Sequence, residues 1–78
     1  MIFLIEYNRE EGRIVTLRLF GDSELADAEG ARLNIELELN RTGVDHEVVL
    51  LEATSEEALR RTHRRYFESL SDIGKSEI

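Results

Sequence analysis

The chain has 78 residues with no cysteine, proline or tryptophan, and its 10 basic and 17 acidic side chains give a net charge of −7. This length allows one small domain with a thin core, and such domains often depend on disulfides, metals or self-association. Without cysteine, disulfides, thiol catalysis and cysteine-ligated metals are excluded, so self-association is the stabilising route left open.

The composition also narrows the compartment and the partners that we expect. No apolar run approaches the roughly 20 residues that a membrane span needs, and the N-terminal segment lacks a basic leader. We therefore expect a cytoplasmic protein that does not contact membranes. The acidic balance argues against generic binding to nucleic acid, which rewards positive charge.

The first elements in chain order are two strands joined by a tight connection. Residues 2–7 (IFLIEY) and 13–20 (RIVTLRLF) are rich in apolar, aromatic and β-branched side chains, which is typical of strands. The polar segment between them, residues 8–12 (NREEG), ends in glycine and suits a five-residue hairpin loop. We therefore predict a β-hairpin at the N-terminus.

A helix is predicted over residues 23–40, because Leu, Ala, Glu and Arg dominate and Gly43 can cap its end. The alternation of apolar and polar residues over 32–39 has instead the period of a strand. The alternative therefore ends the helix at Gly30 and pairs residues 32–39 with 46–53 in a second hairpin. Only Ile35 is β-branched in this stretch, so we favour the long helix.

The chain continues with a strand and a second helix. Residues 46–53 (HEVVLLEA) are predicted to form a buried strand. A second helix is expected from Ser55 to about Leu70, with Thr54 and Glu57 at the spacing of a capping box. We expect one domain over residues 1–70 and a flexible tail over residues 71–78.

These elements predict an α+β fold with the order β-β-α-β-α, and β-β-α-β-β-α if residues 32–39 are a strand. The expected sheet is antiparallel, with strand order 2-1-3 and both helices on one face. The other sheet face would then be uncovered within the chain, and exposed apolar patches commonly mark interfaces. The candidate interface on that face consists of Ile2, Leu4, Ile14, Val48 and Leu50.

The first helix offers a second candidate interface, because it is apolar on two sides. One stripe, suited to packing on the sheet, consists of Leu25, Ala28, Ala31, Ile35 and Leu39. The other stripe, on the opposite side, consists of Ala26, Leu33 and Leu37. This second stripe needs either another part of the chain or another molecule to cover it.

The second helix concentrates basic side chains on an otherwise acidic protein. Residues 1–54 hold 12 acids and 5 bases, whereas residues 55–78 hold 5 of each. The candidate anion-binding residues are Arg60, Arg61, Arg64 and Arg65, because guanidinium groups bind phosphate or carboxylate bidentately. Pairing with acids four residues away is the alternative use, and we expect the pairs Glu56–Arg60, Glu57–Arg61 and Arg64–Glu68.

No constellation of residues predicts catalysis. His63 lies near Thr62 and Tyr66, but no nucleophile or oxyanion site accompanies it. Side chains of Asp45 and Glu47 point away from His46 on a strand, which argues against a metal site. We expect no cofactor, no metal and no enzymatic activity.

The sequence therefore favours a non-enzymatic protein-interaction module that acts as a homodimer, with another protein as a further possible partner. Anion or nucleic-acid binding through the arginine-rich helix is the alternative.

Overall fold

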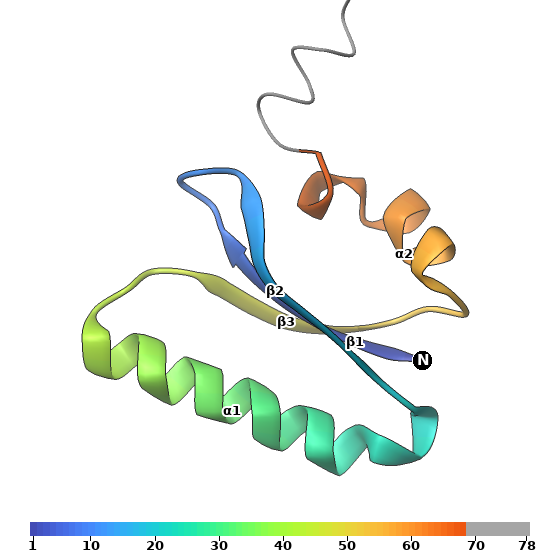
Figure 1. Cartoon of the computed structure of the whole chain (residues 1–78), viewed down its shortest axis with the longest axis horizontal. Coiled ribbons are helices and arrows are strands. Elements are labelled where there is room, and N and C mark those ends of the chain that lie inside the picture. Colours follow the sequence, from blue (N-terminus) through green and yellow to red (C-terminus); the bar gives the residue numbers. More distant parts are fainter. Residues whose placement is uncertain (69–78) are drawn as a thin grey trace, which may run out of the picture.

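The computed structural model describes residues 1–68, which form a three-layer arrangement of helix, sheet and helix (Figure 1). Three strands make the sheet: β1 (Ile2–Asn8), β2 (Arg13–Phe20) and β3 (Glu47–Glu52). Two helices flank it: α1 (Leu25–Thr42) and α2 (Glu56–Thr62). Short 3-10 turns precede α1 at Asp22–Glu24 and follow α2 at Arg64–Tyr66. The predicted α+β class and the order β-β-α-β-α are confirmed.

The sheet is antiparallel and has the predicted strand order β2-β1-β3. Strand β1 is central, and it pairs with β2 from Ile2 opposite Phe20 and with β3 from Ile2 opposite Glu52. In the hairpin loop, Gly12 adopts a φ of 68°, which glycine tolerates without strain. The predicted N-terminal hairpin is therefore confirmed.

The two helices lie on opposite faces of the sheet, so the expectation that both cover one face is wrong. On the α1 side, Ile2, Leu4 and Phe20 pack with Ala28. On the α2 side, the buried cluster consists of Phe3, Ile5, Tyr7, Leu59 and Tyr66. Adjacent strands lie about 4.8 Å apart and a helix is about 10 Å across, so a single helix is wide enough to cover one face of a three-stranded sheet.

Strand β2 changes sides partway along because it carries an irregularity in register. Thr16 pairs with Glu6 but Ile14 pairs with Tyr7, so Val15 is an extra residue between them. This bulge moves Ile14 to the α2-side cluster. The sequence pattern placed Ile14 with Ile2 and Leu4, because strict alternation does not anticipate an inserted residue.

The ambiguous segment 32–39 is helical, because α1 runs without interruption to Thr42. Gly43 ends the helix with a φ of 72°, and its N–H donates to the carbonyl of Leu39. The alternation arises because α1 is apolar on two sides: Ile35 is half-buried against the sheet, whereas Leu33 is exposed. The alternative with a second hairpin is therefore wrong, and the cap at Gly43 is confirmed.

The second helix is shorter than predicted. It begins after Ser55, whose Oγ accepts a hydrogen bond from the N–H of Ala58 at 3.1 Å, so Ser55 caps it rather than Thr54. It ends at His63, where φ is −126° and ψ is 52°. This break turns Tyr66 onto Tyr7, and their ring centroids are 5.1 Å apart. The predicted end at Leu70 and the predicted tail 71–78 lie outside the described residues.

Burial predicts which leucines hold the fold together. Leu59 is fully buried on the α2 side, so Leu59→Ala should lower the free energy of unfolding by about 2–5 kcal/mol. Leu33 is 54% exposed on α1, and Leu33→Ala should cost less than about 0.5 kcal/mol under conditions where the protein is monomeric. Urea unfolding of both variants at low protein concentration compares them, and equal losses would contradict the three-layer arrangement.

Candidate functional site

The predicted sheet-face interface is covered within the chain. Leu4 is fully buried and Ile2 nearly so, while Val48 and Leu50 are half-buried against the same cluster beneath α1. Ile14 lies on the other face of the sheet. The premise that this face lacks a cover is therefore wrong, because α1 lies on it. A charged residue at Leu4 would disrupt the core rather than a dimer.

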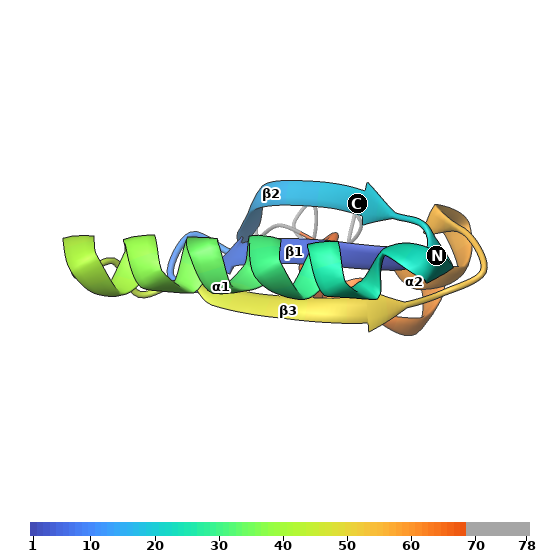
Figure 2. The same ribbon diagram turned by 90° about the horizontal axis from the view of Figure 1, so that it is seen from below.

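The exposed apolar surface of this region lies instead on the outer side of α1. We call it the outer stripe, and it consists of Ala26, Gly30, Leu33 and Leu37. Leu33 and Leu37 are 54% and 58% exposed. Figure 2 shows α1 running along the strands, with its outer side free of other described elements. The second stripe predicted from the sequence is thus uncovered by the described residues.

Gly30 is an unusual member of the outer stripe, because nothing within the described chain requires a glycine there. A Cβ at Gly30 would meet no atom within 4 Å, and its φ is not in the left-handed region. Glycine inside a helix costs about 0.5–1 kcal/mol relative to alanine. No contact among the described residues compensates for this cost, because the space above Gly30 is empty.

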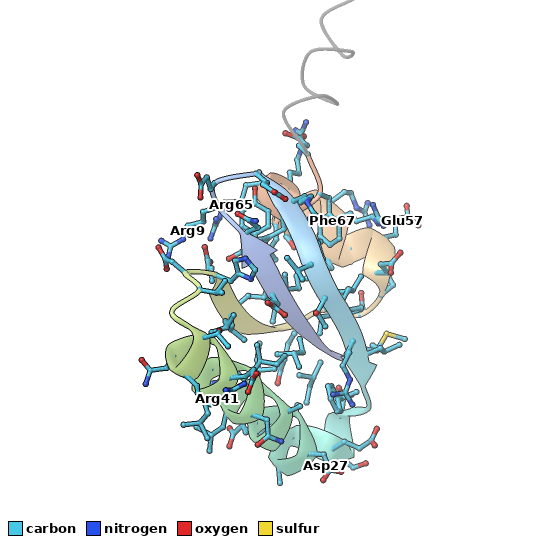
Figure 3. The ribbon with its side chains drawn as sticks, turned by 60° about the vertical axis from the view of Figure 1, so that its left-hand side comes forward. Arg9, Asp27, Arg41, Glu57, Arg65 and Phe67 are labelled. Carbon is cyan, nitrogen blue, oxygen red and sulfur yellow. The ribbon has the colours of Figure 1, made fainter. Side chains whose placement is uncertain are left out.

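Polar and charged side chains border the outer stripe. Asp27, Asn34 and Arg41 follow one another at seven-residue intervals along one flank, and all three are exposed. Figure 3 labels Asp27 and Arg41 toward the two ends of α1. Arg41 also pairs with Glu38 one turn earlier in the helix. On the other flank, Glu36 pairs with Arg32 at 3.3 Å.

Of the four arginines predicted to bind anions, Arg60, Arg64 and Arg65 pair with acidic side chains. Arg60 pairs with Glu56 at 3.3 Å, and Arg64 pairs with Glu68 at 2.9 Å. Two of the three expected i,i+4 pairs are thus formed, while Glu57 and Arg61 do not pair with each other.

Two further contacts of these arginines involve Phe67 and Glu47. Arg60 also lies over the ring of Phe67. Arg65 reaches across to β3, where it pairs with Glu47 at 2.7 Å. The structure therefore does not gather the arginines into one open cluster, and anion binding stays a prediction.

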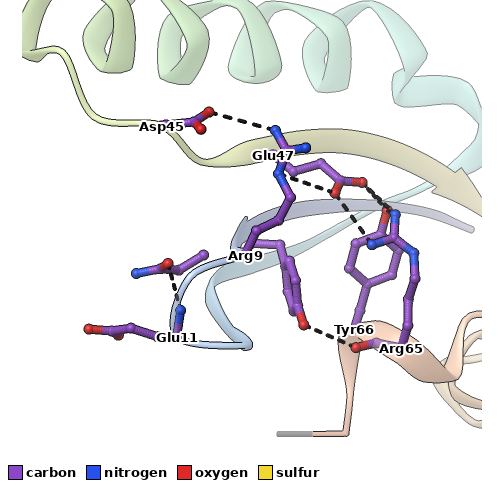
Figure 4. A network of polar contacts seen from close by, with 8 residues as sticks. Arg9, Glu11, Asp45, Glu47, Arg65 and Tyr66 are labelled. Atoms are coloured by element: carbon purple, nitrogen blue, oxygen red, sulfur yellow. Dashed lines mark hydrogen bonds and ion pairs between the residues drawn. The ribbon is translucent and has the colours of Figure 1, made fainter. Parts of the chain in front are cut away.

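A polar network that the sequence did not reveal joins the second 3-10 turn to the sheet (Figure 4). Glu47 on β3 accepts hydrogen bonds from Arg65 and from the hydroxyl of Tyr66. Tyr7 on β1 donates its hydroxyl to the carbonyl of Arg65 at 3.2 Å. Arg9 lies 4.0 Å from Glu47 and 3.6 Å from Asp45. The network anchors the 3-10 turn to the sheet.

This network shifts two protonation equilibria in opposite directions. Hydrogen bonds from Arg65 and Tyr66 hold the pKa of Glu47 below its ordinary value of 4.5. Burial, together with the hydrogen bond to the Glu47 carboxylate, raises the pKa of Tyr66 to about 12. Neither group is poised for proton transfer near neutral pH, so the network is suited to holding structure together.

A second polar cluster lies on the α1 side of the sheet. Glu6 is the one charged side chain in the described core, and its carboxylate accepts a hydrogen bond from Thr16 at 2.9 Å. His46 places Nδ1 2.7 Å from the other carboxylate oxygen. Since both Glu6 oxygens are partnered, the cluster satisfies a buried carboxylate rather than presenting it to a ligand.

The remaining candidate residues do not converge. Asp45 and Glu47 both contact Arg9, whereas His46 contacts Glu6 on the other side of the sheet. Residues 1–68 contain no group of three such side chains arranged to hold a metal ion. His63 is half-buried, with its ring 6.5 Å from that of Tyr66. Among the described residues, no helix is both long and apolar enough to cross a membrane.

Comparison with known proteins gives no relationship to build on. No protein-family model matches the chain, and no curated protein and no solved structure gives a significant match. The candidate site is therefore chosen from the geometry alone, and the outer stripe is the surface that the geometry favours.

The lowered pKa of Glu47 predicts how stability depends on pH. A carboxylate with a lowered pKa in the folded state contributes stability above its ordinary pKa and loses that contribution as the pH falls through the lowered value. Glu47→Gln should therefore cost about 1–2 kcal/mol at pH 7 and progressively less as the pH falls below 4.5. Urea unfolding at a series of pH values from 7 downward measures this, with Glu57→Gln at an exposed position as control. A loss that is independent of pH would contradict the ion pair.

The raised pKa of Tyr66 predicts an alkaline titration. Because the protonated phenol is favoured in the fold, its contribution to stability is complete below pH 10 and is lost as the pH rises toward 12. Ultraviolet absorbance should show one of the two tyrosines ionising near pH 12, provided that circular dichroism shows an intact fold. That transition should be absent from Tyr66→Phe. If it persisted there, the assignment to Tyr66 would be wrong.

Proposed function

We propose that this protein is a non-enzymatic protein-interaction module that acts as a homodimer, and that the outer stripe of α1 is its contact surface. The observation that carries the proposal is the exposure of Leu33 and Leu37, each more than half accessible on a helix whose opposite side already covers the sheet. A helix that only covered a sheet would carry polar residues on its outer side.

Burial of the leucines supplies the driving force for association. Each leucine side chain removed from water gains about 1.5–3 kcal/mol, and a homodimer would bury the leucines of both copies. Part of this gain offsets the entropy lost on association. A contact built around one helix is small, so we expect a dissociation constant in about the micromolar range.

The thin core supports the same interpretation. The sheet has three strands, and each of its faces is covered by one helix. The chain has no cysteine for a disulfide, and self-association is a further source of stability for a domain of this size. A second copy is the partner that is always present at the protein's own concentration.

The proposal predicts the effect of a charge in the outer stripe. Leu37→Glu should convert the dimer to a monomer, because association would bury the carboxylate. Its fold should survive, because Leu37 points away from the core. Sedimentation equilibrium from about 1 to several hundred micromolar measures association, and circular dichroism measures helix content.

Leu25→Glu is the matched control, because Leu25 is an exposed leucine on the same helix but lies outside the outer stripe. This variant should still dimerise. A wild-type chain that is monomeric at several hundred micromolar would overturn the proposed homodimer.

A further inference from the structure

The outer stripe has the spacing of a seam between two helices. Ala26, Gly30, Leu33 and Leu37 follow one another at intervals of four, three and four residues. This is the heptad spacing with which one helix packs against another along a narrow line. A flat sheet or an irregular loop would not need such a line, so the spacing indicates a helical partner.

Gly30 indicates that the partner comes close. The described chain provides no contact that a side chain at this position would disturb, as the open space around it shows. A glycine in a helix seam lets the two backbones approach and makes room for side chains of the opposing helix. The position of Gly30 beside Leu33 thus gives the seam a recess next to a protruding side chain.

The charges along the flank favour one orientation of the two helices. Asp27 and Arg41 lie seven residues before and after Asn34, about 10 Å along the axis in each direction. If two copies of α1 pack antiparallel with Asn34 of each near the twofold axis, Asp27 of each copy meets Arg41 of the other. Leu33 of each copy then packs against Leu37 of the other.

We infer that the partner of the outer stripe is the outer stripe of a second copy, packed antiparallel, with the Asp27–Arg41 contacts formed twice. The inference rests on the proposed homodimer and adds its orientation and register. In this arrangement the two helix dipoles point in opposite directions, which is electrostatically favourable. A parallel pair would instead align the acidic N-terminal halves of both helices, including Asp27 and Glu29.

The absence of cysteine makes a direct test of orientation possible, because single-cysteine variants carry no other thiol. A disulfide requires Cα atoms about 4.4–6.8 Å apart. Asn34→Cys should therefore form an intermolecular disulfide under mild oxidation, since residue 34 of both copies lies at the twofold axis. Ala26→Cys should not, because the two positions would be about 25 Å apart along the axis.

A charge exchange tests the register independently. Asp27→Arg should raise the dissociation constant of the dimer about tenfold, because it places a second positive charge opposite Arg41 at two sites. Arg41→Asp should weaken the dimer by a similar factor. The double variant Asp27→Arg/Arg41→Asp should return to within about threefold of the wild type, because the contacts are restored with reversed sign.

The outcomes separate this inference from the proposed homodimer. Crosslinking of Asn34→Cys but not of Ala26→Cys, with rescue by the charge exchange, supports the antiparallel pair. Crosslinking of Ala26→Cys, with or without that of Asn34→Cys, or failure of the double variant to recover, overturns the inference while the homodimer stands. A wild-type monomer in sedimentation overturns both.

Discussion

The burial of β1 on both faces is the constraint on which the rest of the structure depends. Its residues from Ile2 to Tyr7 are all buried, and their side chains alternate between the two sides of the sheet. A strand of this kind needs a neighbour at each edge and a cover on each face. The pairings with β2 and β3 meet the first need, and α1 and α2 meet the second. Each helix is therefore required to cover its own face of the sheet.

This arrangement separates the roles of the two helices. The short α2 buries Leu59, and the turn after it is fixed through Tyr66, Glu47 and Tyr7, so this side of the molecule is closed by side-chain contacts. The longer α1 covers its face with small and medium residues such as Ala28, Ala31 and Ile35. Its most exposed leucines, Leu33 and Leu37, lie on the opposite side, where the described chain makes no use of them.

The sequence predicted the elements better than it predicted their arrangement. Strand order and the α1 cap followed from local patterns, namely the hairpin glycine, the doubly apolar strands and Gly43. The placement of α2 did not follow, because no local signal says which face a connecting segment crosses to. The bulge at Val15 also leaves no trace in the apolar pattern, so strict alternation predicts the wrong face for Ile14.

The candidate site shows the same division. The second stripe of α1 was readable from its helical period, whereas Gly30 became informative only once the space around it was known. Glu47 joins Arg65 and Tyr66 across 18 and 19 residues of sequence, and pairings at that distance follow from the path of the chain rather than from spacing.

The central position of β1 also sets the order in which the fold can assemble. Ile2 pairs with Phe20 within the hairpin, but its partner on the other side, Glu52, is 50 residues away in the sequence. Local pairings form quickly, whereas distant ones wait for a long loop to close. During synthesis, β1 therefore leaves the ribosome before β3 and keeps an unpaired edge until β3 follows. The first strand of the sheet to be made is one of the last to be fully enclosed.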